Sequence, residues 1–163
     1  EWVSLRKHNQ EYLKPWEPEF NNLKLVKKHY LTRLKSYNKM ARLGKALPFY
    51  VFRSKDKRMI GVCNILDIQR NISQTAKIGY WIGKEYSGLN FGKSAVLAVT
   101  NYCFNELSLN RVEAAVMVKN APSISILKAL GFKEEGILRK NLKINGNWED
   151  HYIFSKILSD NYA

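Results

Sequence analysis

The chain has 163 residues, of which 45% are apolar, and its 27 Lys and Arg against 14 Asp and Glu give a net charge of +13. The length suits one domain with a proper core, and the spread of apolar residues argues against disorder. No apolar run is long enough to span a membrane and no signal peptide opens the sequence, so we expect a cytoplasmic protein. The positive charge favours anionic partners, namely a nucleotide cofactor, RNA or an acidic surface, although a solvated face gives the same composition.

The beginning of the chain combines a polar segment with a predicted long helix. Residues 5–13 are polar with little apolar periodicity, and Pro15 and Pro18 then prevent a helix from continuing. Residues 19–43 are predicted to form an amphipathic helix that ends at Gly44. Its apolar stripe consists of Phe20, Leu23, Val26, Tyr30, Leu34 and Tyr37.

Strands are predicted next, at residues 48–53 and 58–66, joined by a charged turn. Residues 67–74 form a polar loop, and a third strand covers residues 75–82. A helix follows and ends near Leu107, with an apolar face made of Val96, Val99, Cys103 and Leu107. Cys63 and Cys103 lie in apolar segments without metal-ligand spacing, so we expect reduced core cysteines and no metal.

The second half alternates strands and helices. A strand at residues 111–118 precedes a helix at 121–130, which has Pro122 in its first turn and ends at Gly131. Two further strands, 132–139 and 148–157, are linked through Asn145-Gly146. The pattern predicts an α/β fold, with one domain over residues 1–163 and a mixed central β-sheet flanked by helices.

The joint between strand 75–82 and the next helix has the composition of a phosphate cradle. It contains Gly88, Asn90, Gly92 and Lys93. Glycine allows unusual backbone angles and close approach of a ligand, and a helix that begins here aims unpaired N–H groups at the turn. A plain tight turn is the alternative interpretation.

The sequence Ser87-Gly88-Leu89-Asn90-Phe91-Gly92 resembles the acyl-CoA-binding motif, Gln/Arg-x-x-Gly-x-Gly/Ala, of the GNAT superfamily of N-acetyltransferases. Gly92 matches the motif, whereas Ser87 replaces Gln/Arg and Asn90 replaces the central glycine. Asn tolerates left-handed backbone angles, so the loop shape is expected to survive. The resemblance implies that acetyl-CoA binds at Tyr80, Trp81, Ile82, Ser87, Gly88, Leu89, Asn90, Phe91, Gly92, Lys93, Ser94, Asn120 and Ser123.

Further motifs extend the resemblance over nearly the whole chain. They are similar to the branch that acetylates protein N-termini, in particular the alanine of ribosomal protein S5. This resemblance implies direct attack in a ternary complex and splayed strands that admit acyl-CoA. It also implies a first strand of the family upstream of Glu1, which we expect to be missing from this sequence. The motifs cover residues 9–18, 111–114, 120–123, 130–136 and 146–151.

Three residues are candidates for catalysis, and each has a structural alternative. The resemblance places Asn120 on the pantetheine arm and Ser123 beside the sulfur, whereas both residue types also cap helices well. Glu113 could act as general base, directly or through water, or could simply pair with Arg111. The resemblance also implies that backbone N–H groups near a bulge in residues 79–83 polarise the acetyl carbonyl.

The acceptor amine is expected beside aromatic residues and a carboxylate. Trp16 and Trp148 could wall a peptide groove, although aromatic residues in strands more often belong to the core. Asp150 could hold the substrate ammonium, with His151 nearby. A neighbouring His-Asp pair has no catalytic role in most proteins, and this alternative stays open.

These features favour acetyl-CoA-dependent transfer to the N-terminal α-amine of a protein, with a ribosomal protein as the expected partner and the basic surface available to RNA. A small amine, such as a polyamine or an antibiotic, is the first alternative acceptor. A charge of +13 would repel a polycation. A non-catalytic RNA- or ribosome-binding domain is the second alternative, although no motif of a known RNA-binding module occurs. A monomer or a dimer is compatible with the sequence.

Overall fold

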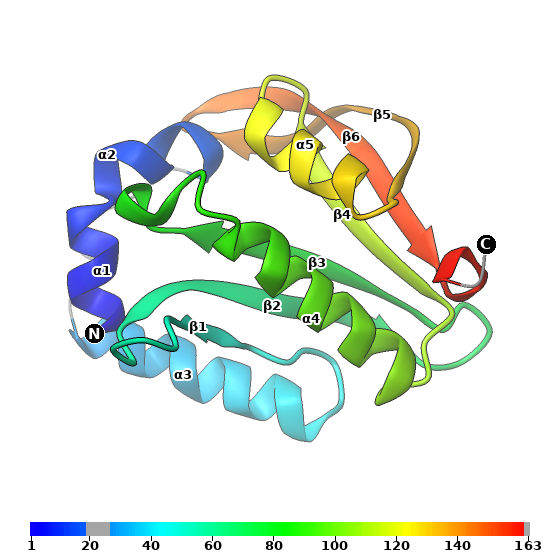
Figure 1. Cartoon of the computed structure of the whole chain (residues 1–163), viewed down its shortest axis with the longest axis horizontal. Coiled ribbons are helices and arrows are strands. Elements are labelled where there is room, and N and C mark those ends of the chain that lie inside the picture. The colour runs from blue at the N-terminus through cyan, green and yellow to red at the C-terminus, as the bar shows by residue number, and fades with distance from the viewer. Residues whose placement is uncertain (19–26, 162–163) are drawn as a thin grey trace.

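A computed structural model describes residues 1–18 and 27–161 (Figure 1). It contains a six-stranded sheet with the order β1-β2-β3-β4-β6-β5. Neighbouring strands are antiparallel, except that β3 and β4 run parallel. The mixed sheet predicted from the sequence is thereby confirmed. The strands are β1 (Tyr50–Phe52), β2 (Met59–Gln69), β3 (Thr75–Ile82), β4 (Arg111–Met117), β5 (Lys133–Ile144) and β6 (Asn147–Ile157).

Helices cover both faces of the sheet. α4 (Phe91–Asn105) and α5 (Ala121–Ala129) pack on one face, where their apolar residues join the main core. α1 (Trp2–His8) and α3 (Lys27–Arg42) pack on the other face, against Val62 and Trp81. Residues 1–18 and 27–161 also contain four short helical segments, and no helix in these ranges is long and apolar enough to cross a membrane. The four segments are α2 (Gln10–Leu13), η1 (Lys14–Trp16), η3 (Lys84–Tyr86) and η4 (Leu158–Asn161).

The N-terminal segment is helical, which its weak apolar periodicity did not predict. Its buried residues are Trp2, Arg6, Asn9 and Leu13, which follow helical spacing closely. Two of these four residues are polar, so a search for periodic apolar residues does not detect the helix. Arg6 is paired with Glu17, and Asn9 is hydrogen-bonded on both sides of its amide.

Most predicted strands and helices are confirmed, with differences at their ends. β3 has the predicted bounds, whereas β2 continues to Gln69 because Ile68 is buried, and β5 continues to Ile144. Asn145 and Gly146 have φ of 46° and 87°, as a two-residue hairpin turn requires. The predicted helix 19–43 is observed over Lys27–Arg42 and followed by Gly44 with φ of 64°, and its residues 19–26 lie outside the described part.

The two central strands separate along their length, as predicted. β3 and β4 pair only from Thr75 and Arg111 to Lys77 and Glu113. Beyond these residues β3 stays paired with β2, and β4 stays paired with β6. The sheet therefore consists of two halves that are joined at one end and open at the other.

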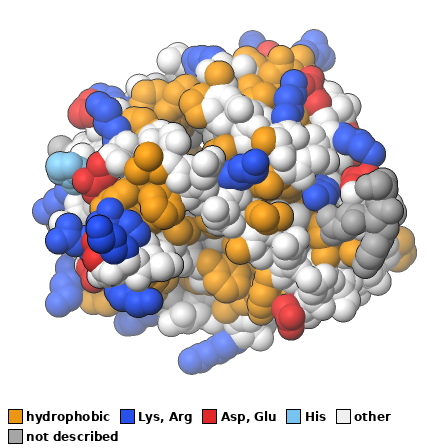
Figure 2. Space-filling model, in the orientation of Figure 1, with side chains coloured by type: hydrophobic (Ala, Val, Ile, Leu, Met, Phe, Trp, Pro, Cys, Tyr) orange, Lys and Arg blue, Asp and Glu red, His pale blue; other side chains and the backbone are white. Residues whose placement is uncertain are grey.

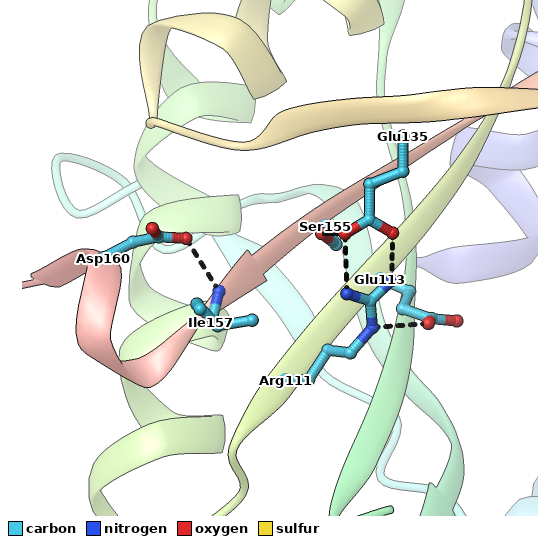
Figure 3. Close-up of polar contacts among 6 residues, drawn as sticks. All are labelled: Arg111, Glu113, Glu135, Ser155, Ile157 and Asp160. Carbon is cyan, nitrogen blue, oxygen red and sulfur yellow. Dashed lines mark hydrogen bonds and ion pairs between the residues drawn. The ribbon is translucent and has the colours of Figure 1, made fainter.

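An ionic cluster holds the joined end together (Figure 3). Arg111 on β4 donates from Nε to Glu113 over 2.7 Å and from Nη1 to Glu135 over 2.8 Å. The Ser155 hydroxyl on β6 donates to the same Glu135 carboxylate over 2.6 Å. The guanidinium and the hydroxyl stabilise the charged form, and they lower the pKa of Glu135 to about 2.

We expect Glu135→Gln to lower the free energy of unfolding at neutral pH by about 1 kcal/mol, because a charge-assisted hydrogen bond at a partly exposed site is lost. The pKa of Glu135 in the folded state lies below its usual value of 4.5. The carboxylate therefore stabilises the fold fully above pH 4.5, and this contribution is lost as the pH falls toward about 2. Urea unfolding over this range should show the wild type and the variant converging. Glu134→Gln, on the same strand, is the control for charge, and a constant difference at all pH values would contradict the assignment.

Candidate active site

A cleft of about 810 Å³ lies where β3 and β4 separate. Its lining includes Ile78, Tyr80 and Ile82, whose side chains point to the α4 and α5 face, and also Val62, Asn64 and Trp81 from the opposite face. The cleft is therefore lined from both faces of the sheet. A long molecule can enter from one face while a second molecule reaches the same point from the other.

The N-terminus of α4 borders the cleft and is shaped to bind an anion. Gly88 has φ of 77°, and Asn90 has φ of 62° and ψ of 0°, so both adopt left-handed backbone angles. Asn90 is the N-cap, but its side chain makes no capping hydrogen bond. The N–H groups of the first turn of a fifteen-residue helix are thereby left to a ligand, and the helix dipole favours a negative one. A pyrophosphate fits this N-terminus.

Gly92 allows three elements to approach one another. A Cβ at this position would lie 3.1 Å from Ile126 Cδ1 on α5 and 3.6 Å from Ile82 Cγ1 on β3. A larger side chain would therefore push α4 away from α5 as well as narrow the cleft. Of the other cradle residues, Ser87 accepts a 3.4 Å hydrogen bond from the Tyr12 hydroxyl, and Leu89 is largely exposed.

Backbone amides of β3 face the cleft because β4 has moved away. The register of β2 and β3 is continuous from Lys77 to Ile82, so the expected bulge in residues 79–83 is absent. Gly83 donates its N–H to Ile60 on β2 over 2.8 Å, and alternate residues of an antiparallel strand point their N–H groups to opposite sides. The N–H groups of Tyr80 and Ile82 therefore point toward the open side, where they can polarise a carbonyl oxygen.

Asn120, Ser123 and Tyr80 meet at one end of the cleft. The Asn120 side chain accepts from the Ser123 N–H over 3.3 Å and thus caps α5. The Ser123 hydroxyl makes no hydrogen bond to another described side chain or backbone group. The Tyr80 hydroxyl donates to the Ser123 carbonyl oxygen over 3.4 Å, and burial raises its pKa to about 12, so it stays protonated at neutral pH.

Glu113 lies away from these residues. It sits at the last paired position of β3 and β4, opposite Lys77, and is not part of the cleft lining. Its carboxylate accepts from Arg111 Nε over 2.7 Å in the ionic cluster of Figure 3. This geometry favours the structural alternative over the role of general base.

The acceptor residues expected from the sequence are only partly brought together. Trp16 is half-buried and lines the cleft, whereas Trp148 is 60% exposed and does not. Asp150 is also outside the lining, and its Oδ1 accepts the Lys140 N–H over 2.7 Å where the β5 register shifts. Asp150 therefore supports a strand irregularity in this structure.

Three charged or titratable residues of the lining were not predicted or were given little weight. Glu17 is the one acidic residue among the described residues that line the cleft. Its carboxylate accepts a hydrogen bond from Arg6 over 2.7 Å. Arg33 reaches the cleft from α3. His151 is 3% exposed, and its Nδ1 lies 3.0 Å from the Glu149 carbonyl oxygen. That oxygen can only accept, so Nδ1 carries a proton, and in the neutral imidazole Nε2 is the nitrogen with the lone pair.

Strand alternation could have located His151, because it pairs with Met117 and points away from the core residue Phe154. Glu17 lies between Pro15 and Pro18, and no local pattern places its side chain. Its position depends on the burial of Arg6, which only the fold reveals.

The chain belongs to the GNAT acetyltransferase family, because the family model "Acetyltransferase (GNAT) domain" matches residues 2–133. A probable N-acetyltransferase of Bacillus subtilis (strain 168) is 40% identical over 128 residues, which are 78% of this chain and 71% of that protein. The ribosomal protein uS5-alanine N-acetyltransferase of Escherichia coli (strain K12) is 31% identical over 145 residues, 89% of this chain and 75% of that protein.

Solved structures of acetyltransferases are also similar to this chain. Ribosomal-protein-S5-alanine acetyltransferase from Vibrio fischeri has a TM-score of 0.89 and 31% identity, with 95% of this chain and 85% of that chain covered. RimJ of Mycobacterium smegmatis in complex with CoA-disulfide has a TM-score of 0.93 and 28% identity, with 98% and 77% covered. The chain is thus an acetyl-CoA-dependent N-acetyltransferase, and the uncapped α4 N-terminus fits the cofactor pyrophosphate.

We predict that Asn90→Val weakens acetyl-CoA binding by about tenfold, because a β-branched residue in the left-handed region costs roughly 1–2 kcal/mol. Asn90→Gly is the matched control and should bind as the wild type does, since glycine adopts these angles freely. Titration calorimetry with acetyl-CoA measures both variants. Equal affinity for Val and Gly at this position would show that the left-handed Asn90 does not shape the binding loop.

Proposed function

We propose that the enzyme transfers the acetyl group of acetyl-CoA to the N-terminal α-amine of a protein, and that this protein is ribosomal. The observation that carries the proposal is the cleft lined from both faces of the sheet. A cofactor with its pyrophosphate at α4 enters from the α4 and α5 face. The opposite face, with Trp16, Glu17 and Trp81, is then free for a peptide that reaches the thioester end-on.

The names of the relatives support this acceptor. The Escherichia coli relative, at 31% identity, is described as acting on an alanine of ribosomal protein uS5, and the Vibrio fischeri structure as acting on an alanine of ribosomal protein S5. A peptide terminus also suits the chemistry, because an α-amine has a pKa near ~7.7–8.0 and is partly neutral at physiological pH. A lysine side chain, with a pKa near ~10.4, would need a stronger base.

The proposed mechanism is direct attack of the amine on the thioester carbonyl. Acetyl-CoA supplies the activated acetyl group. The N–H groups of Tyr80 and Ile82 bind the carbonyl oxygen as negative charge develops on it. His151 Nε2 takes the proton that the amine loses, directly or through a water, and the Ser123 hydroxyl hydrogen-bonds the departing sulfur.

The charge of the cleft argues against a polyamine as acceptor. Among the described lining residues, the carboxylate of Glu17 already neutralises Arg6, and Arg33 and Lys93 add positive charge. A ligand with several ammonium groups would lack partners there. A peptide terminus brings only one charge to this region.

We expect peptides that begin with Ala or Ser to be acetylated on the α-amine. Incubation with acetyl-CoA, followed by tandem mass spectrometry, identifies the modified nitrogen. The same peptides with a blocked N-terminus and a free lysine are the control and should stay unmodified. Label on lysine, or on free spermidine with none on the peptides, would contradict the proposal.

We predict that Ser123→Ala lowers kcat by up to about a hundredfold with little change in acetyl-CoA affinity, because the hydrogen bond to sulfur strengthens only as the thiolate forms. Asn120→Ala should instead lower the free energy of unfolding by roughly 0.5–2 kcal/mol, since Asn120 is the cap. Single-turnover kinetics and thermal unfolding separate the two effects. A Ser123→Ala enzyme with unchanged kcat would show that another donor, Tyr80 or water, serves the thiolate.

A further inference from the structure

The outer surface of α3 carries a row of basic side chains. Lys28, Lys35, Lys39 and Arg42 are all exposed, and they follow one another at steps of seven, four and three residues. At 3.6 residues per turn they fall within about 60° of the helix circumference and extend over about 21 Å of its length. We call these four residues the α3 stripe.

The stripe points away from the protein. The half-buried residues of the helix are Tyr30, Arg33, Leu34, Tyr37 and Ala41, which lie on the side opposite the stripe. Tyr30 and Tyr37 contact the N-terminal region and the sheet, so the apolar side of α3 is already used. The stripe itself has no structural task in packing the helix.

Acidic residues are missing from the stretch of sequence that contains the stripe. The sequence contains no Asp or Glu from residue 20 to residue 55. Several exposed cations elsewhere have acidic partners, for example Lys77 with Asp67 and Lys133 with Asp160, whereas others, such as Lys45 and Lys143, form no ion pair within the described residues. No stripe residue forms an ion pair with any residue in 1–18 or 27–161. Basic side chains also outnumber acidic ones on the molecular face in Figure 2, many of them at its rim.

We propose that the α3 stripe binds the phosphate backbone of double-stranded RNA. Unpaired cations in a straight row gain affinity by releasing counterions from a phosphate backbone. Single-stranded RNA is a poorer fit, because it needs aromatic side chains for base stacking and the stripe has none. An anionic membrane is a poorer fit too, because the apolar side of α3 faces the sheet and is not available for insertion.

The location of α3 connects this surface with the acceptor side of the cleft. Arg33, on the inner side of the same helix, lines the cleft, and α3 covers the sheet face opposite to α4 and α5. A duplex on the stripe would lie about one helix diameter, roughly 10 Å, from this entrance. If the proposed function holds, α3 binds ribosomal RNA next to the protein terminus that is acetylated.

The test compares two variants that lose the same charge. In the stripe variant Lys28, Lys35, Lys39 and Arg42 are replaced by Gln, and in the control variant Arg58, Lys77, Lys128 and Lys133 are replaced by Gln. The control residues are exposed and paired with acidic side chains outside the cleft lining. Circular dichroism and thermal unfolding establish that both variants are folded. Arg42→Gln with Lys39→Gln is the smaller variant to use if the fourfold change unfolds the protein.

Binding is measured by fluorescence anisotropy with a fluorescent RNA duplex of about 16 base pairs, the span of one double-stranded-RNA domain. The stripe variant should bind about tenfold or more weakly than the control, and its plot of log K against log salt should be shallower by about 3. Equal binding by both variants, or no binding by the wild type at physiological salt, would overturn the proposal. So would stripe-dependent binding to phosphatidylserine vesicles without binding to RNA.

Kinetics then separate this inference from the proposed function. With a free acceptor peptide the stripe variant should keep the wild-type kcat/KM, and with ribosomal subunits it should lose about tenfold in kcat/KM through KM. If the stripe variant acetylates ribosomal subunits as well as the wild type does, and peptides are acetylated, only the RNA surface is refuted. Duplex binding that depends on the stripe, without peptide acetylation, would refute the proposed acceptor alone.

Discussion

The separation of β3 from β4 is the constraint on which the other features depend. A parallel pair that stayed in register to Ile82 would use the N–H groups of Tyr80 and Ile82 in the sheet and leave no cleft. Because pairing ends at Lys77 and Glu113, these groups face an open channel instead. Unpaired backbone groups are costly when buried, so the arrangement is stable only where solvent or a ligand meets them. The two N–H groups are therefore available to hydrogen-bond a carbonyl oxygen in the cleft.

Each half of the open sheet has its own support. β4 keeps its full pairing with β6, and Arg111, Glu113, Glu135 and Ser155 fix the joined end. β3 stays paired with β2 from Lys77 to Ile82, and α4 follows β3 along the chain. The halves are joined at the ionic cluster, and α4 and α5 approach each other at Gly92, where a Cβ would lie 3.1 Å from Ile126 Cδ1. Glycine at position 92 therefore allows α4 to pack close to α5 and also leaves room for a ligand.

The sequence predicted features that depend on neighbours along the chain. The left-handed Asn90, the hairpin at Asn145 and the bounds of β3 were all accessible from local residue preferences. The role of Glu113 as general base and that of Asp150 as ligand of the substrate ammonium were harder to judge, because both depended on which partner each carboxylate meets in space. Arg111 and the Lys140 N–H are those partners. The N-terminal helices were missed for a related reason, since Arg6 and Asn9 occupy buried positions that apolar periodicity does not count.

These two buried polar residues connect the acceptor side with the cofactor side. Asn9 is 1% exposed, donates to the Leu5 carbonyl over 2.9 Å and accepts from the Lys84 N–H over 2.7 Å, just before the cradle. Arg6 lies 5.1 Å from the Trp81 ring and is paired with Glu17. A hydrophobic residue at either position could pack as well, but it would not fix the direction of its neighbours. The polar contacts orient Glu17 and the cradle relative to β3, so α1 and its C-cap residue Asn9 hold both sides of the cleft in place.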